Sequence, residues 1–207
     1  DRSMFLSDFD FDLPEELIAT RPASPRSSAR LLVANGNNIN DSFVEDLPKF
    51  LKSGDRLVLN DTKVLPARLN GVRNRSFDGN KISYANIEVT LLAEKKQRIW
   101  SALIKPLRRI KLGETIYFNK SFKAKLIDKV NGQALLQFNI EGPEFFKCLD
   151  DLGVMPLPPY IASKRKADNR DRLDYQTIFA QKLGSVAAPT ASLHFDKALL
   201  DKIKNIG

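Results

Sequence analysis

The sequence predicts a mixed α+β protein in which an α/β lobe is interrupted by a small antiparallel β-barrel. Five short β-like runs at close spacing fill the middle of the chain, at residues 87–91, 99–104, 115–118, 122–127 and 134–140. Asn131 and Gly132 lie between the last two runs, and this dipeptide is typical of a two-residue hairpin turn. Short strands joined by turns favour a barrel. Helical and strand-like segments precede and follow this insert.

The chain divides by composition into a lobe and an insert. Residues 70–80 are polar and lack apolar periodicity, so we interpret them as a mobile loop that opens the insert. A predicted helix over residues 143–152, with proline near its start and glycine after its end, closes the insert. We therefore assign residues 1–69 and 154–207 to a discontinuous α/β lobe, and residues 70–153 to the barrel domain.

The predicted elements of the first lobe segment are brief. Asp12 can cap a helix over residues 14–19, and a second short helix begins at Asp46. Residues 31–33 and 57–59 are apolar triplets that predict strands. Helices and strands therefore alternate up to the insert.

The second lobe segment begins with a proline-rich stretch. Residues 155–161 contain three prolines and predict a stiff, extended segment. A charged stretch over residues 164–172 follows it. Close to residue 207, Asp196 can cap a helix that runs through Ile203.

Composition narrows the class of protein. Lysine and arginine outnumber acidic residues by 33 to 25, for a net charge of +8. That balance favours a polyanionic partner, because cations on a protein surface release counterions from phosphates. A single cysteine, Cys148, excludes an internal disulfide framework and fits a reducing cytosol. With no secretory signal and no run near the roughly 18 apolar residues of a membrane span, we expect a cytoplasmic protein without a membrane partner.

The most informative stretch is Gly184-Ser-Val-Ala-Ala-Pro-Thr-Ala-Ser-Leu-His-Phe195, which holds the only histidine, His194. Small residues let a backbone come close to a ligand. Serine and threonine supply hydrogen-bond donors and acceptors, and histidine exchanges a proton near neutral pH. These properties indicate a substrate site. The alternative is a buried turn in which His194 is hydrogen-bonded in the core.

This stretch resembles the signature of the S-adenosylmethionine:tRNA ribosyltransferase-isomerase family, which makes epoxyqueuosine in tRNA. Four further segments resemble motifs of the same family in the same order: Phe9 to Ala19 with Arg21-Pro22 and Pro25-Arg26, Asn60 to Arg68, Pro156 to Ile161, and Asp174 to Thr177. The resemblance extends from residue 9 to residue 195. It implies the same plan as the pattern above, a barrel-like α/β lobe interrupted by a β-barrel.

The resemblance also implies a reaction. The family transfers the ribosyl moiety of S-adenosylmethionine to the 7-aminomethyl-7-deazaguanine base of tRNA, isomerises it, and releases adenine and methionine. S-adenosylmethionine is then a substrate, and we expect no cofactor. The sequence contains no zinc-like cluster of cysteine and histidine, so we expect no metal either. The implied partners are this tRNA and S-adenosylmethionine, and we expect a monomer.

Site residues follow from the positions that match the motifs. His194 and Asp61 are the candidates for proton transfer. The candidates for substrate binding are Arg21, Arg68, Tyr160, Asp174, Tyr175, Ser185, Pro189 and Thr190. Several have a structural alternative: capping or a turn for Asp61, a pair with a nearby arginine for Asp174, core packing for the tyrosines, and solvated surface or salt-bridge roles for the arginines. Lys120, Lys123 and Lys125 of the insert are expected to help hold tRNA.

Two features depart from the family pattern. Ser192 stands where the family has glycine, which affects how closely a ligand approaches the backbone there. The chain also ends at Gly207, whereas family members are substantially longer and carry a further motif of the Thr-Leu-His-Val-Gly type.

Other functions fit the sequence less well. A serine hydrolase built on Ser185, His194 and Asp196 lacks the Gly-x-Ser-x-Gly elbow. A methyltransferase would require a glycine-rich loop after an early strand, and none is present. An RNA-binding module without catalysis, based on the β-rich insert, stays open as the alternative.

Overall fold

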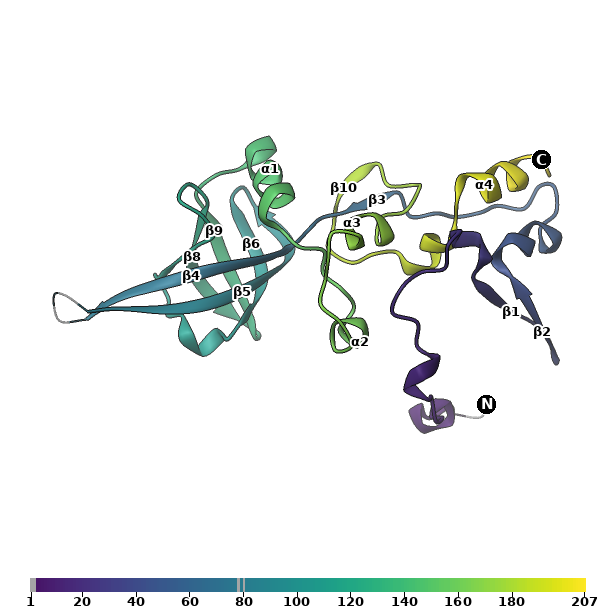
Figure 1. Ribbon diagram of the computed structural model, residues 1–207, viewed down its shortest axis with the longest axis horizontal. Helices are drawn as coiled ribbons and strands as arrows, with labels where there is room; N and C mark the ends of the chain where they lie inside the picture. Colours follow the sequence, from purple (N-terminus) through teal and green to yellow (C-terminus); the bar gives the residue numbers. More distant parts are fainter. Residues whose placement is uncertain (1–2, 78, 80) are drawn as a thin grey trace.

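The computed structural model describes residues 3–77, 79 and 81–207, with the backbone alone for residues 183–185. Its two parts follow one another along the long axis of the molecule, with the barrel at one end and the lobe at the other (Figure 1). No helix in these ranges is long and apolar enough to cross a membrane.

Six antiparallel strands close into the barrel in the order β4-β5-β6-β9-β8-β7. They are β4 (Arg68–Phe77), β5 (Lys81–Lys96), β6 (Ile99–Lys105), β7 (Thr115–Tyr117), β8 (Lys123–Val130) and β9 (Gln133–Phe138), with the short 3₁₀ helix η5 (Leu107–Arg109) between β6 and β7. The mixed α+β class and the closed antiparallel barrel are therefore confirmed.

Alternation along the strands produces the barrel core. Ile87, Val89 and Leu91 on β5 are at most 1% exposed, because every second side chain of a strand points to the same face. Helix α1 (Gly142–Leu152) packs against the barrel and places Phe145 in this core, where its ring stacks on Trp100 at 5.2 Å between centroids. The predicted helix over residues 143–152 is confirmed.

The hairpin between β8 and β9 turns at the predicted dipeptide. Asn131 has φ +49° and Gly132 has φ +77°, both in the left-handed region that a two-residue hairpin turn of this type requires. Asparagine and glycine adopt this region at low cost. The local prediction is confirmed.

The predicted loop over residues 70–80 is wrong, because residues 68–77 form strand β4. The positions of β4 that face the barrel interior are Leu69, Gly71 and Arg73, and only the first is apolar. A side chain on Gly71 would lie 2.5 Å from Ile116 Cγ2, so glycine allows β7 to approach. The buried Arg73 donates from Nε to the Arg109 carbonyl at 3.0 Å. The strand's apolar period is therefore hidden, because Gly71 leaves room for β7 and the buried Arg73 is hydrogen-bonded.

Among the residues that the structure describes, the elements of the lobe are short. They are the 3₁₀ helices η1 (Leu6–Phe9), η2 (Glu15–Leu17), η3 (Arg26–Ser28), η4 (Val44–Phe50) and η6 (Thr190–His194), the α-helices α2 (Pro159–Ala162), α3 (Asp171–Asp174) and α4 (Lys197–Lys204), and the strands β1 (Arg30–Asn35), β2 (Asn38–Phe43), β3 (Thr62–Val64) and β10 (Lys182–Ser185). β1 and β2 form an antiparallel hairpin, and β10 pairs in parallel with β3.

Two lobe predictions hold because local chemistry decides them. The predicted strand over residues 31–33 lies inside β1. Asp196 caps α4, since its Oδ1 accepts a hydrogen bond from the Leu199 amide at 2.8 Å. The cap satisfies an amide that has no partner within the helix.

Other lobe predictions need correction. Residues 57–59 are exposed and unpaired in the structure, so the predicted strand there is wrong; β10 pairs instead with residues 62–64. The helix predicted over residues 14–19 is a single 3₁₀ turn that follows Pro14, and Asp12 does not cap it. The helix predicted to begin at Asp46 is the 3₁₀ helix η4, which starts two residues earlier.

Residues 155–161 are extended only as far as Pro158, after which α2 begins. Pro159 takes the first helical position, where its fixed φ and missing N–H cost nothing. The stiff segment is therefore shorter than the sequence predicts.

Candidate active site

All five motif segments contribute to a second hydrophobic core, which lies in the lobe. Its buried members are Val64, Met155, Leu157, Ile161, Tyr175 and Leu193, with Ile18 and Ala188 packed against them. Ile18 belongs to the first motif, Val64 to the second, and Leu193 to the last. Segments from opposite ends of the chain therefore meet at one place, and the side chains beside this core form the candidate site.

Gln176 joins the fourth motif to the second. Its Oε1 accepts a hydrogen bond from the Val64 amide at 2.9 Å, and its Nε2 donates to the Val64 carbonyl at 3.2 Å. The Gln176 carbonyl in turn accepts a hydrogen bond from Arg26 Nη1 at 2.8 Å, which brings in the first motif. Gln176 was not among the predicted site residues, although it lies inside a quoted motif.

The last motif is connected in two ways. Strand β10 pairs with β3, which sets Lys182 opposite Thr62. At the other end, Ser27 Oγ donates to Asp196 Oδ2 at 2.5 Å, and this hydrogen bond lowers the pKa of the Asp196 carboxyl. Asp196 therefore caps α4 and holds the N-terminal segment at the same time.

A cluster of arginines and aspartates surrounds α3. Asp171 is fully buried and accepts two hydrogen bonds from Arg165, at 2.7 and 2.9 Å. Arg21 Nη1 donates to Asp171 at 3.0 Å and lies 3.5 Å from Asp174 Oδ2, and Arg21 also pairs with Asp168. Burial opposes ionisation of Asp171, but the hydrogen bonds from Arg165 and from the Asp168 amide outweigh it, so its pKa is lowered.

Two predicted substrate-binding residues, Arg21 and Asp174, are members of this cluster. Their charges are paired with one another and with neighbours that the sequence reasoning did not single out, namely Arg165, Asp168 and Asp171. The signal that could have found these neighbours is the density of charge over residues 164–172 next to a quoted motif. A multiply paired arginine has a defined position, and this precision is what a substrate site requires.

Asp61 lies beside the pairing of β3 and β10. Its carbonyl accepts hydrogen bonds from the amides of Gln181, at 2.7 Å, and Lys182, at 3.1 Å. Its carboxylate is 43% exposed and lies 3.1 Å from Lys182 Nζ. Asp61 therefore precedes strand β3 rather than following a strand at residues 57–59, and its carboxylate faces solvent in part.

His194 is the last residue of η6 and is exposed. The alternative in which this histidine is hydrogen-bonded in the core is wrong. Thr190, the first residue of η6, is also exposed, and the half-buried Pro189 precedes it. Ser185 ends strand β10, and its side chain lies outside the part of the chain that the structure describes. Exposed polar groups therefore line the segment that follows β10.

The two tyrosines differ in their surroundings. Tyr160 on α2 is 55% exposed, so its ring is available to a ligand. Tyr175 is 9% exposed within the second core, and this burial raises its pKa. The ring of Tyr175 is a core element in this structure.

Arg68 lies at the junction of lobe and barrel, where β4 begins. Its backbone exchanges hydrogen bonds with Val154, and its Nε lies 3.9 Å from Glu88 Oε1. It therefore lies apart from the ionic cluster around α3. Across the described side chains, no three His, Cys, Asp or Glu residues are arranged to hold a metal ion.

Comparison with known proteins gives one consistent result. A family profile described as "Queuosine biosynthesis protein" matches residues 6–207. A protein of Roseobacter denitrificans named S-adenosylmethionine:tRNA ribosyltransferase-isomerase is 61% identical over 200 residues, which cover 97% of this chain and 57% of that protein. A protein of the same name from Ruegeria pomeroyi is 59% identical over 95% of this chain and 56% of its own length.

A crystal structure of S-adenosylmethionine tRNA ribosyltransferase from Thermotoga maritima is 26% identical, over 97% of this chain and 55% of that one, with a TM-score of 0.35. The chain spans somewhat more than half the length of the curated relatives that it matches. The profile match covers nearly all of its residues. The chain belongs to the queuosine biosynthesis protein family.

Proposed function

We propose that this chain forms part of an S-adenosylmethionine:tRNA ribosyltransferase-isomerase. In this reaction the ribosyl moiety of S-adenosylmethionine is transferred to the 7-aminomethyl-7-deazaguanine base of tRNA and isomerised, giving epoxyqueuosine, and adenine and methionine are released. The observation that carries the proposal is the identity of 61% over 97% of the chain to a protein of that name. The convergence of the five motifs on one core supports it.

The reaction requires a proton acceptor and a donor for the leaving adenine. The sulfonium of S-adenosylmethionine acidifies the neighbouring ribose 5′ carbon, so a base can remove a proton there while adenine departs and the sugar ring opens. The amine of the tRNA base then attacks, and closure of the epoxide completes the change as methionine leaves. S-adenosylmethionine is consumed as a substrate, and the proposed chemistry calls for no cofactor or metal.

His194 and Asp61 are the groups proposed for these proton transfers. Both are accessible, which a group that touches substrate must be. Ser185, Pro189 and Thr190 are proposed to contact S-adenosylmethionine along the same segment. Tyr160 is proposed to stack on a base, since aromatic rings bind bases face to face. Arg21 and Asp174 are proposed to border the site as a fixed pair.

The distribution of charge supports a tRNA partner. Residues 68–138 carry 15 basic and five acidic residues, for a net charge of +10, whereas the rest of the chain carries 18 basic and 20 acidic residues. The positive charge of the protein therefore belongs to the barrel segment. We propose that the barrel holds tRNA while the lobe holds S-adenosylmethionine, and that the protein works as a monomer in the cytosol.

Adenine release tests the proposed function. The purified protein is incubated with S-adenosylmethionine and tRNA that carries the 7-aminomethyl-7-deazaguanine base, and adenine is measured by chromatography. We expect adenine and methionine in equal amounts and a matching gain of mass on the tRNA. The control is tRNA with guanine at the same position, because guanine lacks the aminomethyl group that attacks. Binding of the modified tRNA without adenine release would instead support an RNA-binding module.

A further inference from the structure

A hollow opens on the outer face of the barrel over β4 and β5, with Tyr117 and Phe118 at one edge. β7 pairs with β4 at two positions only, Val72 with Tyr117 and Arg73 with Ile116. The lining of the hollow runs from β4 across β5 to Lys105 at the end of β6, and its volume is about 420 Å³. This volume is in the range of about 300–1,000 Å³ that small-molecule sites occupy.

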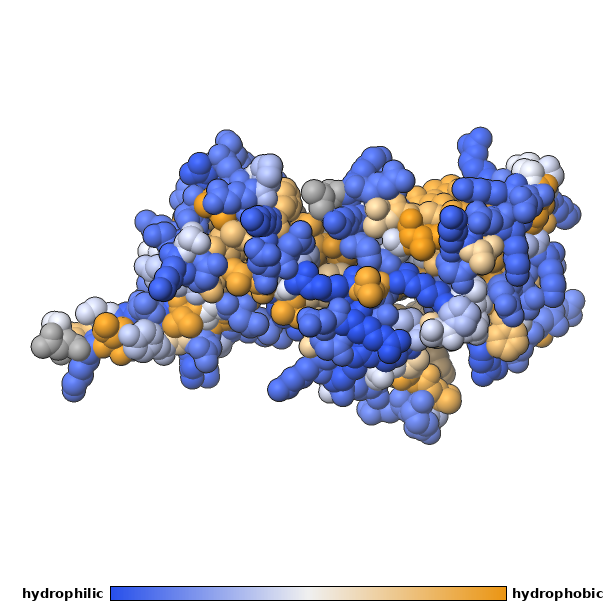
Figure 2. Space-filling model, turned by 45° about the horizontal axis from the view of Figure 1, so that its top comes forward, coloured by the Kyte–Doolittle hydropathy of each residue, from blue (hydrophilic) through white to orange (hydrophobic). Residues whose placement is uncertain are grey.

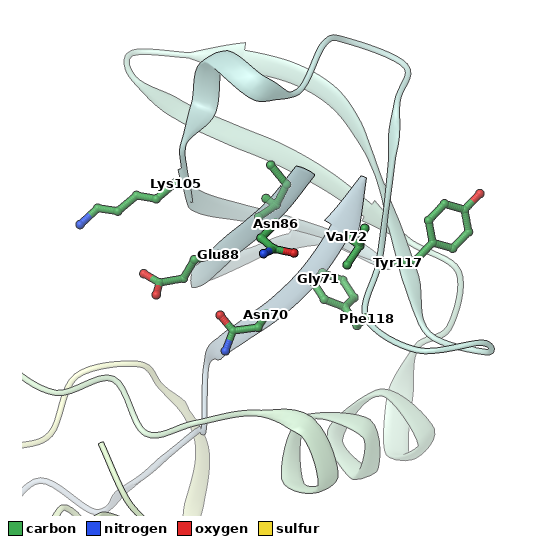
Figure 3. Close-up of a pocket in the computed structure, with 9 residues that line it drawn as sticks. Asn70, Gly71, Val72, Asn86, Glu88, Lys105, Tyr117 and Phe118 are labelled. Carbon is green, nitrogen blue, oxygen red and sulfur yellow. The ribbon is translucent and has the colours of Figure 1, made fainter. Parts of the chain in front are cut away.

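Polar side chains of β4 and β5 line one side of this hollow. Asn70, Asn86 and Glu88 project to the same side of the sheet, with Lys105 beyond Glu88 and Tyr117 at the opposite edge (Figure 3). The amides supply both donors and acceptors, and the carboxylate supplies acceptors only. Such a set matches the edge of a nucleobase, which carries donors and acceptors side by side.

The strand register continues this surface around the barrel. Asn86 pairs with Val72, Val72 with Tyr117, and Tyr117 with Lys123, so these four outward side chains form one row across four strands. Paired residues of neighbouring strands lie on the same face, and the strands are about 4.8 Å apart. The row is therefore about 14 Å long.

The far end of the row is aromatic and basic. Tyr117 is 40% exposed, and Lys123 Nζ lies 5.9 Å from the centre of its ring. Lys123, Lys125 and Arg98 line a second hollow of about 280 Å³ next to Tyr117. Figure 2 shows that hydrophilic side chains cover much of the barrel surface.

We propose that this row, Asn86–Val72–Tyr117–Lys123 with Glu88 and Lys125 beside it, binds two or three unpaired nucleotides of RNA. One base enters the hollow and meets Asn86 and Glu88, the next stacks on Tyr117, and Lys123 and Lys125 neutralise the phosphates. Stacking on an aromatic ring together with a basic track is how proteins hold single strands. The inference rests on the proposed function, since it names the surface that receives tRNA.

Binding of fluorescently labelled tRNA, measured by anisotropy at several salt concentrations, tests the row. For the double variant Lys123→Ala/Lys125→Ala we expect weaker binding and a slope of log K against log salt that is smaller by about 1.4, because two phosphate contacts are lost from a single strand. The matched control is Lys147→Ala/Lys197→Ala, which removes two exposed lysines from α1 and α4. An unchanged affinity and slope relative to this control would overturn the proposal.

Variants of Tyr117 distinguish the contribution of stacking to tRNA binding from the contribution of charge. Tyr117→Ala should weaken tRNA binding about 5- to 150-fold without changing the salt slope, since it removes a ring and no charge. Tyr117→Phe should bind tRNA as tightly as the wild type does. Thermal unfolding of both Tyr117 variants checks that they are folded. Loss of binding in Tyr117→Phe, or none in a folded Tyr117→Ala, would contradict a stacking role.

Glu88 is tested with two short single strands, oligocytidylate and oligouridylate. Cytosine presents an amino donor where uracil presents an acceptor oxygen, so a carboxylate in the hollow should favour the cytosine strand. Glu88→Gln should reduce this preference, because an amide serves either base. Equal binding of both strands to the wild type would remove base recognition from the hollow.

Adenine release distinguishes this proposal from the proposed function. If the wild type releases adenine but the row variants bind tRNA as tightly as the control, the proposed RNA-binding row is wrong. The proposed function is then still supported. If the row variants lose tRNA binding and the wild type releases no adenine, the RNA-binding row is supported and the proposed function is wrong.

Discussion

Gln176 and Val64 exchange two hydrogen bonds across 112 residues of sequence, with the Val64 amide donating to Oε1 and Nε2 donating to the Val64 carbonyl. The primary amide of the side chain acts here as a peptide group would in a sheet. It satisfies the donor and the acceptor of a buried residue at the end of β3, where β10 pairs on one side only. The fourth motif is thereby held to the second.

Replacing Gln176 with alanine should lower the free energy of unfolding by about 1–3 kcal/mol, since each neutral hydrogen bond contributes about 0.5–1.5 kcal/mol. Urea unfolding followed by circular dichroism measures the change. Gln181→Ala, which alters an exposed glutamine near the same strands, should change stability by less than about 0.5 kcal/mol. Equal stability of the two variants would mean that the hydrogen bonds to Val64 do not hold β3.

Asp171→Asn should destabilise the lobe by about 2–4 kcal/mol, because it leaves Arg165 without its buried carboxylate partner. The matched control is Asp168→Asn. That carboxylate is half exposed, so its loss should cost less than about 1 kcal/mol. Urea denaturation of both variants measures the difference, and a larger loss in Asp168→Asn would place the centre of the cluster elsewhere.

The ionisation of Glu114 should make the stability of the barrel depend on pH in the acid range. A bidentate hydrogen bond from Arg75, at 2.6 and 3.0 Å, lowers the pKa of Glu114 to about 2. Because the folded pKa lies below the unfolded value, the carboxylate stabilises the fold above about pH 4.5, and this contribution disappears as the pH falls towards 2.

Glu114→Gln should therefore cost about 1–2 kcal/mol at pH 7 and much less at pH 3, measured by urea unfolding at both values. Glu94→Gln, at an exposed position on β5, is the control and should cost little at either pH. If the free energies of unfolding of Glu114→Gln and the wild type differ by the same amount at pH 7 and pH 3, the pair with Arg75 does not cause the pH dependence.

His194→Ala should reduce the rate of adenine release by about 10²–10⁴-fold if the imidazole transfers a proton. Because His194 is exposed, its removal should leave the fold intact, which thermal unfolding checks. Steady-state kinetics at saturating tRNA measure the rate, with Thr190→Ala as a control that should weaken S-adenosylmethionine binding by about 0.5–1.5 kcal/mol instead. Normal turnover by a folded His194→Ala protein would transfer the role to Asp61.

Features that depend on a few neighbouring residues could be predicted from the sequence. Asn131-Gly132 turns the β8–β9 hairpin because both residues accept a positive φ, and Asp196 caps α4 because its oxygen reaches an amide three residues away. The barrel was also predictable, since alternation on β5 and its neighbours needs only the period of a strand. The candidate segment from Gly184 to Phe195 was identified from its own residue types.

Tertiary structure alone decided which polar and small residues serve the interior. Gly71 and Arg73 hide a strand from any pattern of apolar residues, because Gly71 makes room for β7 and the buried Arg73 donates to a backbone carbonyl 36 residues away. Residues 57–59 have the composition of a strand, yet β10 pairs with residues 62–64 instead. Arg21 meets Asp171 across 150 residues, and no local preference encodes such a partner. Dihedral preferences act over a few residues, whereas sheet pairing and buried charge depend on what the rest of the chain brings alongside.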